Sequence, residues 1–193
     1  MYDPLHCGLF LMLAFVLAGL VHSLWMKNRF SQAFAIPLDG GLMFRGRPIL
    51  GENKTLRGFV VMIPAAALAF AAIAILISLP QGAPPATLWQ LTPMGYAALG
   101  AWAGFGFMAA ELPNSFIKRQ LGILPGRAPA SRVTRAICFT VDHIDSVLGM
   151  LAAVTLAVHT PWTTWLWVLI LGPSIHLLFS WWLFRMGVKR RPA

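Results

Sequence analysis

Residues 58–79 read GFVVMIPAAALAFAAIAILISL, an apolar run that contains no Asp, Glu, Lys or Arg. A helix needs about 20 mainly apolar residues to cross the hydrocarbon core of a bilayer, so this run is long enough for a span. Four further runs of this kind lie at about 8–26, 93–112, 136–158 and 163–184. The sequence therefore predicts an all-α integral membrane protein with about five transmembrane helices.

The composition favours the same class. Of the 193 residues, 58% are hydrophobic and only 11% are charged, which is too apolar for a soluble domain of this size. The chain contains no internal repeat, low-complexity segment or shift in composition that would mark a second domain. We expect residues 1–193 to form a single membrane domain.

The positions of the basic residues predict the topology. A formal net charge of +9 would suggest a nucleic-acid partner for a soluble protein. Here, however, all fifteen Lys and Arg residues lie in the segments at about 27–57 and 113–135 or after the last run. Because basic loops stay on the cytoplasmic side, we expect an N-out, C-in chain and no nucleic-acid partner. The two long loops would form a cytoplasmic cap over the bundle.

Three of the six acidic residues, Glu111, Asp142 and Asp145, lie inside or at the ends of predicted spans. A carboxylate at the centre of a spanning helix costs about 2.5–3.5 kcal/mol, so it needs a partner or a function. Asp142 and Asp145 share one helical face, roughly 9 and 13 Å from the cytoplasmic end. Gly149, one turn further, allows another backbone to approach that face. The carboxylates could pair with nearby arginines or hold a divalent cation.

A cluster of Ser115, Lys118 and Arg119 follows Glu111. If the third helix continues past the membrane edge, Glu111, Ser115 and Lys118 lie on one stripe of it. A carboxylate, a hydroxyl and an ammonium group in a row suit a metal-bound polyphosphate. A basic helix end that reaches for the membrane interface is the alternative, above all for Arg119.

A second basic cluster, with Lys54 and Arg57, lies in a polar turn that leads into the run at 58–79. Backbone N–H groups at a helix start, together with two cations, make an anion site. Anchoring of the span at the membrane surface explains these cations equally well. Asp39 lies in a Gly-flanked turn, where a capping role is expected.

Three motifs make the chain resemble the CDP-archaeol synthases and, more distantly, the bacterial CDP-diacylglycerol synthases. They are RPILGENKTLRG at 47–58, ELPNSFIKRQLGILPG at 111–126 and DHIDS at 142–146. The chain departs from the family pattern at a few positions, with Glu111 where Asp is usual and His143 and Ser146 in the archaeal Asp-Gln-x-Asp-Phe pattern.

The resemblance implies a membrane cytidylyltransferase that transfers CMP from CTP to a lipid phosphate, giving a CDP-activated lipid and pyrophosphate for phospholipid synthesis. It implies Mg²⁺, with two ions expected, held by Glu111, Asp142 and Asp145. Catalysis would rest on Asp142, Asp145 and Lys118. The residues that would bind the substrate phosphates are Lys54, Arg57, Ser115, Lys118 and Arg119. The partners would be CTP, the lipid phosphate and the bilayer, and the active site would face the cytoplasm from the cell membrane.

Two other functions stay open at this point. A transporter or channel with an anion-binding inner mouth would also carry basic inner loops, although the outer halves of the spans offer few ionisable groups. A CDP-alcohol phosphotransferase would carry an Asp-Gly-x-x-Ala-Arg pattern, but no Ala-Arg pair follows Asp39 and Gly40. The residues do not distinguish isoprenoid ether chains from acyl ester chains on the lipid, and they leave the oligomeric state open.

Overall fold

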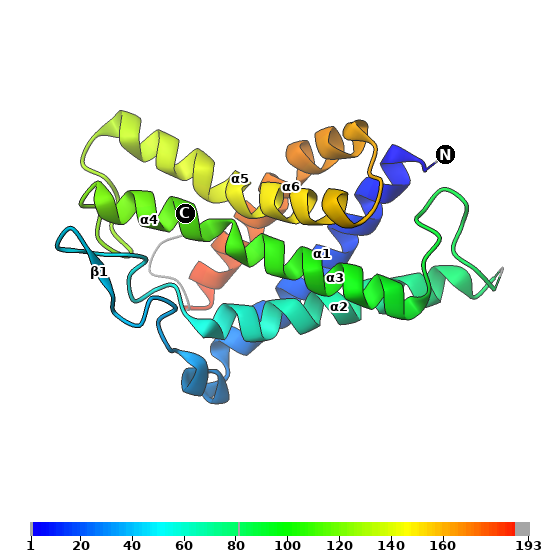
Figure 1. Ribbon diagram of the computed structural model, residues 1–193, viewed down its shortest axis with the longest axis horizontal. Helices are drawn as coiled ribbons and strands as arrows, with labels where there is room; N and C mark the ends of the chain where they lie inside the picture. The colour runs from blue at the N-terminus through cyan, green and yellow to red at the C-terminus, as the bar shows by residue number, and fades with distance from the viewer. Residues whose placement is uncertain (1, 81, 188–193) are drawn as a thin grey trace.

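The computed structural model describes residues 2–80 and 82–187, and they are mainly helical (Figure 1). One long helix covers most of each of the five apolar runs. The elements in chain order are α1 (Pro4–Lys27), the 3-10 helix η1 (Arg29–Phe34), β1 (Met43–Phe44), β2 (Arg47–Pro48), α2 (Leu56–Ser78), α3 (Pro93–Ala109), α4 (Glu111–Gln120), α5 (Arg132–Ala157) and α6 (Trp162–Arg185).

By length and composition, four helices in the described part of the chain could cross a membrane: α1, α2, α5 and α6. The remaining predicted span, 93–112, is longer than the helix found there, because α3 has 17 residues and ends at Ala109. Pro113 explains this end, since it has no N–H for the carbonyl of Ala109 and its ring crowds that carbonyl. The helix restarts at Glu111 as α4, where Pro113 falls in the first turn and is tolerated. The loop predicted for 113–135 is therefore helical as far as Gln120.

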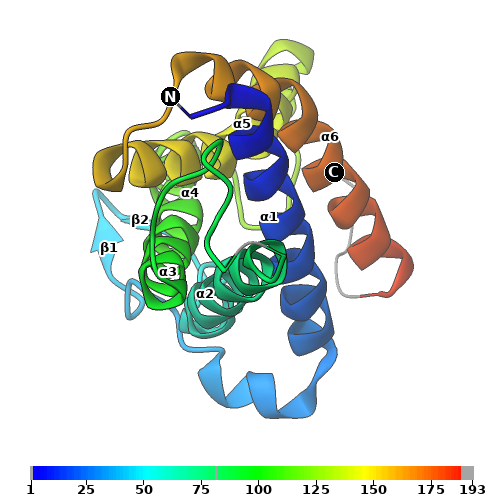
Figure 2. The same cartoon turned by 90° about the vertical axis from the view of Figure 1, so that its right-hand side faces the viewer.

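The five long helices form a closed ring. Each contacts two neighbours, in the order α1, α2, α3, α5, α6 and back to α1. Figure 2 views α2 and α3 nearly end-on and shows α1 between α2 and α6. The ring encloses a cavity of about 290 Å³ that is lined by residues of all five helices.

Asp39 ties together the segment between α1 and α2. One oxygen of its buried carboxylate accepts hydrogen bonds from the N–H groups of Leu50 (2.8 Å) and Gly51 (2.9 Å), and the other accepts from Gly41 (3.0 Å). Burial opposes ionisation of this carboxyl, but the three N–H donors outweigh it and hold the pKa of Asp39 below its usual range. The turn role expected for Asp39 therefore extends over twelve residues of chain.

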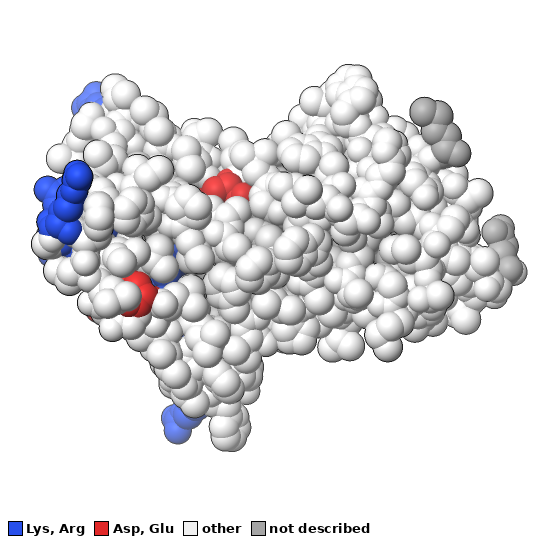
Figure 3. All heavy atoms as spheres, in the orientation of Figure 1, with Lys and Arg blue, Asp and Glu red and all other residues white. Residues whose placement is uncertain are grey.

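The hairpin of β1 and β2 rests on α4. The rings of Phe44 and Phe116 lie 5.8 Å apart, and Arg47 donates to the backbone carbonyl of Gln120. The two predicted cytoplasmic segments thus contact each other at one end of the ring. On the face shown in Figure 3, the visible Lys and Arg side chains gather around this end, and the opposite end shows none.

Candidate active site

The crossing of α3 and α5 brings the three membrane acids together. The two helices approach so closely at Gly106 and Gly149 that a Cβ added to Gly149 would lie 2.3 Å from the Gly106 carbonyl oxygen. From this crossing, Glu111 lies five residues further along the chain and Asp145 four residues back. Because neighbouring α3 and α5 run in opposite directions, these displacements lead to the same end. The approach predicted for Gly149 is confirmed.

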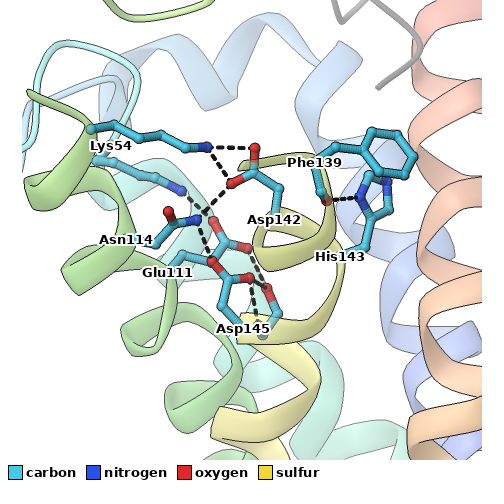
Figure 4. A network of polar contacts seen from close by, with 9 residues as sticks. Lys54, Glu111, Asn114, Phe139, Asp142, His143 and Asp145 are labelled. Atoms are coloured by element: carbon cyan, nitrogen blue, oxygen red, sulfur yellow. Dashed lines mark hydrogen bonds and ion pairs between the residues drawn. The ribbon is translucent and has the colours of Figure 1, made fainter. Parts of the chain in front are cut away.

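Two polar side chains link the three carboxylates (Figure 4). The amide nitrogen of Asn114 donates to Asp142 Oδ1 (2.6 Å) and to Asp145 Oδ2 (2.8 Å). The hydroxyl of Ser146 lies 2.8 Å from Glu111 Oε1 and 3.3 Å from Asp145 Oδ1. The acids therefore form one cluster, whose members come from α4 and α5.

Two lysines place positive charge against this cluster. Lys54 pairs with Glu111 Oε2, and Lys118 donates to both oxygens of Asp142. Burial alone would lower the pKa of Lys54, but the neighbouring carboxylates, Glu111 foremost and then Asp145 and Asp142, together outweigh this effect and raise it above its ordinary value. Lys54 therefore stays charged, and the cluster contains three carboxyl groups and two ammonium groups.

The backbone around Lys54 is fixed by the segment that Asp39 organises. The N–H of Leu38 donates to the Lys54 carbonyl (2.9 Å), and the Lys54 N–H donates to the Gly51 carbonyl (3.1 Å). Lys54 thus reaches the acids from a loop that is held on both sides. Lys118 reaches them from α4, so the two cations have independent supports.

The other predicted substrate-binding residues lie outside this network. Arg57 donates to the carbonyl of Met26 in the last turn of α1, so it links the start of α2 to the end of α1. Ser115 is buried, but its hydroxyl makes no hydrogen bond to any residue that the structure describes.

Arg119 is also buried, and its Nε has no hydrogen-bond partner among the described residues. Burial lowers the pKa of Arg119, and the negative charge of Asp142 partly offsets this effect. This influence of Asp142 indicates that Arg119 lies within electrostatic range of the cluster.

Asn114 and Ser146 are the members of the site that the sequence did not predict. The stripe on α4 that faces α5 consists of Glu111, Asn114 and Lys118, in place of the predicted Glu111, Ser115 and Lys118. The i, i+3 and i, i+7 spacing of Asn114 and Lys118 from Glu111 could have indicated it. No comparable spacing pointed to Ser146, whose contact with Glu111 joins two different helices.

The donor set suits a hard divalent cation in its chemistry, because carboxylate oxygens are the ligands that Mg²⁺ prefers. As the side chains lie, however, each carboxylate faces an N–H or O–H donor. Within residues 2–80 and 82–187, no group of three or more His, Cys, Asp or Glu side chains is arranged so that it could hold a metal ion. His143 lies on another side of α5, where its Nδ1 is 2.7 Å from the Phe139 carbonyl oxygen (Figure 4).

Comparisons with known proteins identify relatives of this chain. The family model for CarS-like CDP-archaeol synthase matches residues 9–192. A CDP-archaeol synthase of Halobacterium salinarum is 32% identical over 164 residues, which cover 81% of this chain and 82% of the relative. A CDP-archaeol synthase of Hyperthermus butylicus is 34% identical over 145 residues, which cover 75% of this chain and 67% of the relative.

One solved structure shares the fold. It is described as an intramembrane enzyme for archaeal membrane lipids biosynthesis, with a TM-score of 0.54 and 23% identity over 86% of this chain and 88% of that one. The family match spans almost the whole chain and includes all three acids of the cluster. The chain therefore belongs to the CDP-archaeol synthase family and is a membrane-embedded, CTP-dependent lipid cytidylyltransferase.

Proposed function

We propose that this protein transfers CMP from CTP to the phosphate of a glycerol diether with isoprenoid chains, at the cluster of Glu111, Asp142 and Asp145. The archaeal relatives, which are named CDP-archaeol synthases, support this lipid over a diacyl glycerol phosphate. The products are a CDP-activated lipid and pyrophosphate. The cluster faces the cytoplasm, where CTP is available and where the basic loops are expected to lie.

The observation that carries this proposal is that the cluster and the cavity share residues. Apolar residues line most of the cavity, including Phe15, Met62 and Ile175. Lys54 and Glu111 line it as well. A lipid phosphate needs this combination, because its chains require an apolar volume and its headgroup requires nearby cations.

The reaction needs little proton transfer. A phosphate monoester has a second pKa of about 6, so the lipid phosphate is already largely dianionic at neutral pH. Its oxygen attacks the α-phosphorus of CTP, a new P–O bond forms, and pyrophosphate leaves from the opposite side. The obstacle is repulsion between the two anions, which Lys54 and Lys118 reduce by neutralising phosphate oxygens. Ser115 contacts phosphate and forms no covalent intermediate.

Two Mg²⁺ ions would be held by Asp142, Asp145 and Glu111. They would neutralise negative charge at the phosphates. Lys118 has to exchange its contact with Asp142 for one with phosphate, which a flexible four-carbon side chain allows. Arg119 and Arg57 are further candidates for phosphate contacts. Arg119 is the better placed of the two, since Arg57 is bonded to Met26.

The experiment offers purified protein CTP with an equimolar mixture of diether and diacyl glycerol phosphates, and mass spectrometry identifies the CDP-lipid formed. We expect the diether product, with equimolar pyrophosphate, and no product when EDTA removes divalent cations. Formation of the diacyl product alone would contradict the proposed lipid. Net consumption of CDP-lipid, or solute flux across proteoliposomes without chemical change, would contradict the proposed reaction.

A further inference from the structure

Ser146 lies at the contact between α4 and α5, the two helices that carry the acids. Its side chain is fully buried, with 0% of the residue exposed. The hydroxyl has a single proton, and the shorter of its two carboxylate contacts is the 2.8 Å contact to Glu111 Oε1. The Ser146 N–H also lies 2.7 Å from Asp145 Oδ1. One residue therefore contacts an acid on α4 and an acid on α5.

These contacts assign every oxygen of Glu111 and Asp145 to a partner. Glu111 Oε1 accepts from Ser146 while Oε2 pairs with Lys54. Asp145 Oδ1 accepts from the Ser146 N–H while Oδ2 accepts from Asn114. Without the Ser146 hydroxyl, Glu111 Oε1 would lose its hydrogen bond from α5, while Oε2 would keep its pair with Lys54. That lysine has a long and flexible side chain, so it fixes the direction of the carboxylate poorly.

We propose that Ser146 is a positioning residue that orients Glu111 toward the cation and phosphates of the bound substrate. This inference rests on the proposed function of the cluster. Groups that orient metal-binding carboxylates typically change metal affinity or activity by about 10–100-fold when they are removed. A hydroxyl that only filled space would have no such effect, because alanine leaves out a single oxygen atom.

The test measures the affinity of the purified protein for Mn²⁺ and CTP together, by calorimetry, alongside its unfolding temperature. We expect Ser146→Ala to weaken binding about 10-fold or more. Ser146→Thr keeps the hydroxyl and should retain affinity better than Ser146→Val, which has almost the same shape without it. Ser78→Ala is the matched control, because the Ser78 hydroxyl donates to the Ala74 carbonyl of its own helix (2.6 Å) and to no other residue that the structure describes. It should bind like the wild type.

A double-mutant cycle separates positioning from a general structural role. Ser146→Ala should cause no further loss of affinity in a Glu111→Gln background, because the two groups act through one contact. Wild-type affinity of Ser146→Ala, equal losses in Ser146→Thr and Ser146→Val, or additive losses in the cycle would overturn the positioning role. If Glu111→Gln and Asp145→Asn themselves bind like the wild type, the proposed site fails together with it.

Discussion

Gly149→Ala tests whether the crossing of α3 and α5 sets the geometry of the acids. A methyl group at this position would lie 2.3 Å from both the Gly106 carbonyl oxygen and the Ala110 Cβ, whereas ordinary contacts begin near 3.4 Å. The two helices therefore have to separate by about 1 Å. Overpacking of this kind costs about 1–3 kcal/mol of stability, and the better helix propensity of alanine offsets about 1 kcal/mol. We expect the variant to remain folded.

The separation acts on catalysis more than on stability. Glu111 and Asp145 lie about one turn from the crossing on opposite helices, so the added distance falls between carboxylates that now share the Ser146 hydroxyl. A displacement of about 1 Å can lower turnover by about 10²-fold. The assay is the initial rate of CDP-lipid formation at saturating CTP and lipid phosphate.

Gly8→Ala is the control for this prediction. Its added Cβ would lie 3.3 Å from the Trp167 Cβ, a contact that α1 and α6 can accommodate far from the acids. This variant should turn over at the wild-type rate. A Gly149→Ala enzyme that also keeps the wild-type rate would show that the acids tolerate a change in the helix crossing, contrary to this prediction.

Three further predictions follow from other parts of the structure. The pKa of Asp39 is lowered, so its contribution to stability is complete above the unfolded-state pKa of about 3.9 and disappears as the pH falls through the lowered pKa. The thermal stability of the wild type should therefore fall below about pH 4. Asp39→Ala leaves buried N–H donors unpaired and should lose about 1–3 kcal/mol of stability at neutral pH, as calorimetry would show. Ile175→Trp adds bulk to the cavity and should raise KM for the lipid phosphate severalfold with KM for CTP unchanged, as steady-state kinetics would show; an equal rise in both would contradict the cavity assignment. Arg57→Met should clearly lower the unfolding temperature and raise KM for CTP little, because Arg57 bonds to Met26. Lys118→Met should clearly raise KM for CTP and lower the unfolding temperature little, because Lys118 belongs to the cluster.

The sequence predicted the helices well and their arrangement poorly, for a physical reason. Apolar runs indicate contact with lipid, and basic loops indicate contact with water. The environment of the chain changes abruptly from lipid to water at the end of a span, so α1, α2, α5 and α6 lie close to their predicted ranges. Which helices are neighbours is a different matter. In a bilayer the lipid-facing and helix-facing sides are both apolar, so the pattern contains little information about the ring or its cavity.

The site shows the same division. The acids were predictable because a charge in an apolar span has few explanations other than function. Asn114 and Ser146 were missed because their importance arises from contacts between α4 and α5. The helix break at Ala110 was missed because Pro113 had been read as part of a loop. Arg57 shows the converse, since its place in a motif did not predict its hydrogen bond to the end of α1.

The most direct test of the central claim, that the acids of α5 carry the transfer chemistry, is the rate of CDP-lipid formation by Asp142→Asn and Asp145→Asn. Asparagine keeps the size of each side chain, removes the negative charge and replaces one acceptor oxygen with an NH₂ donor. We expect that neither variant forms CDP-lipid above the rate without enzyme, while both unfold at temperatures close to that of the wild type. Full turnover by either variant would contradict this claim.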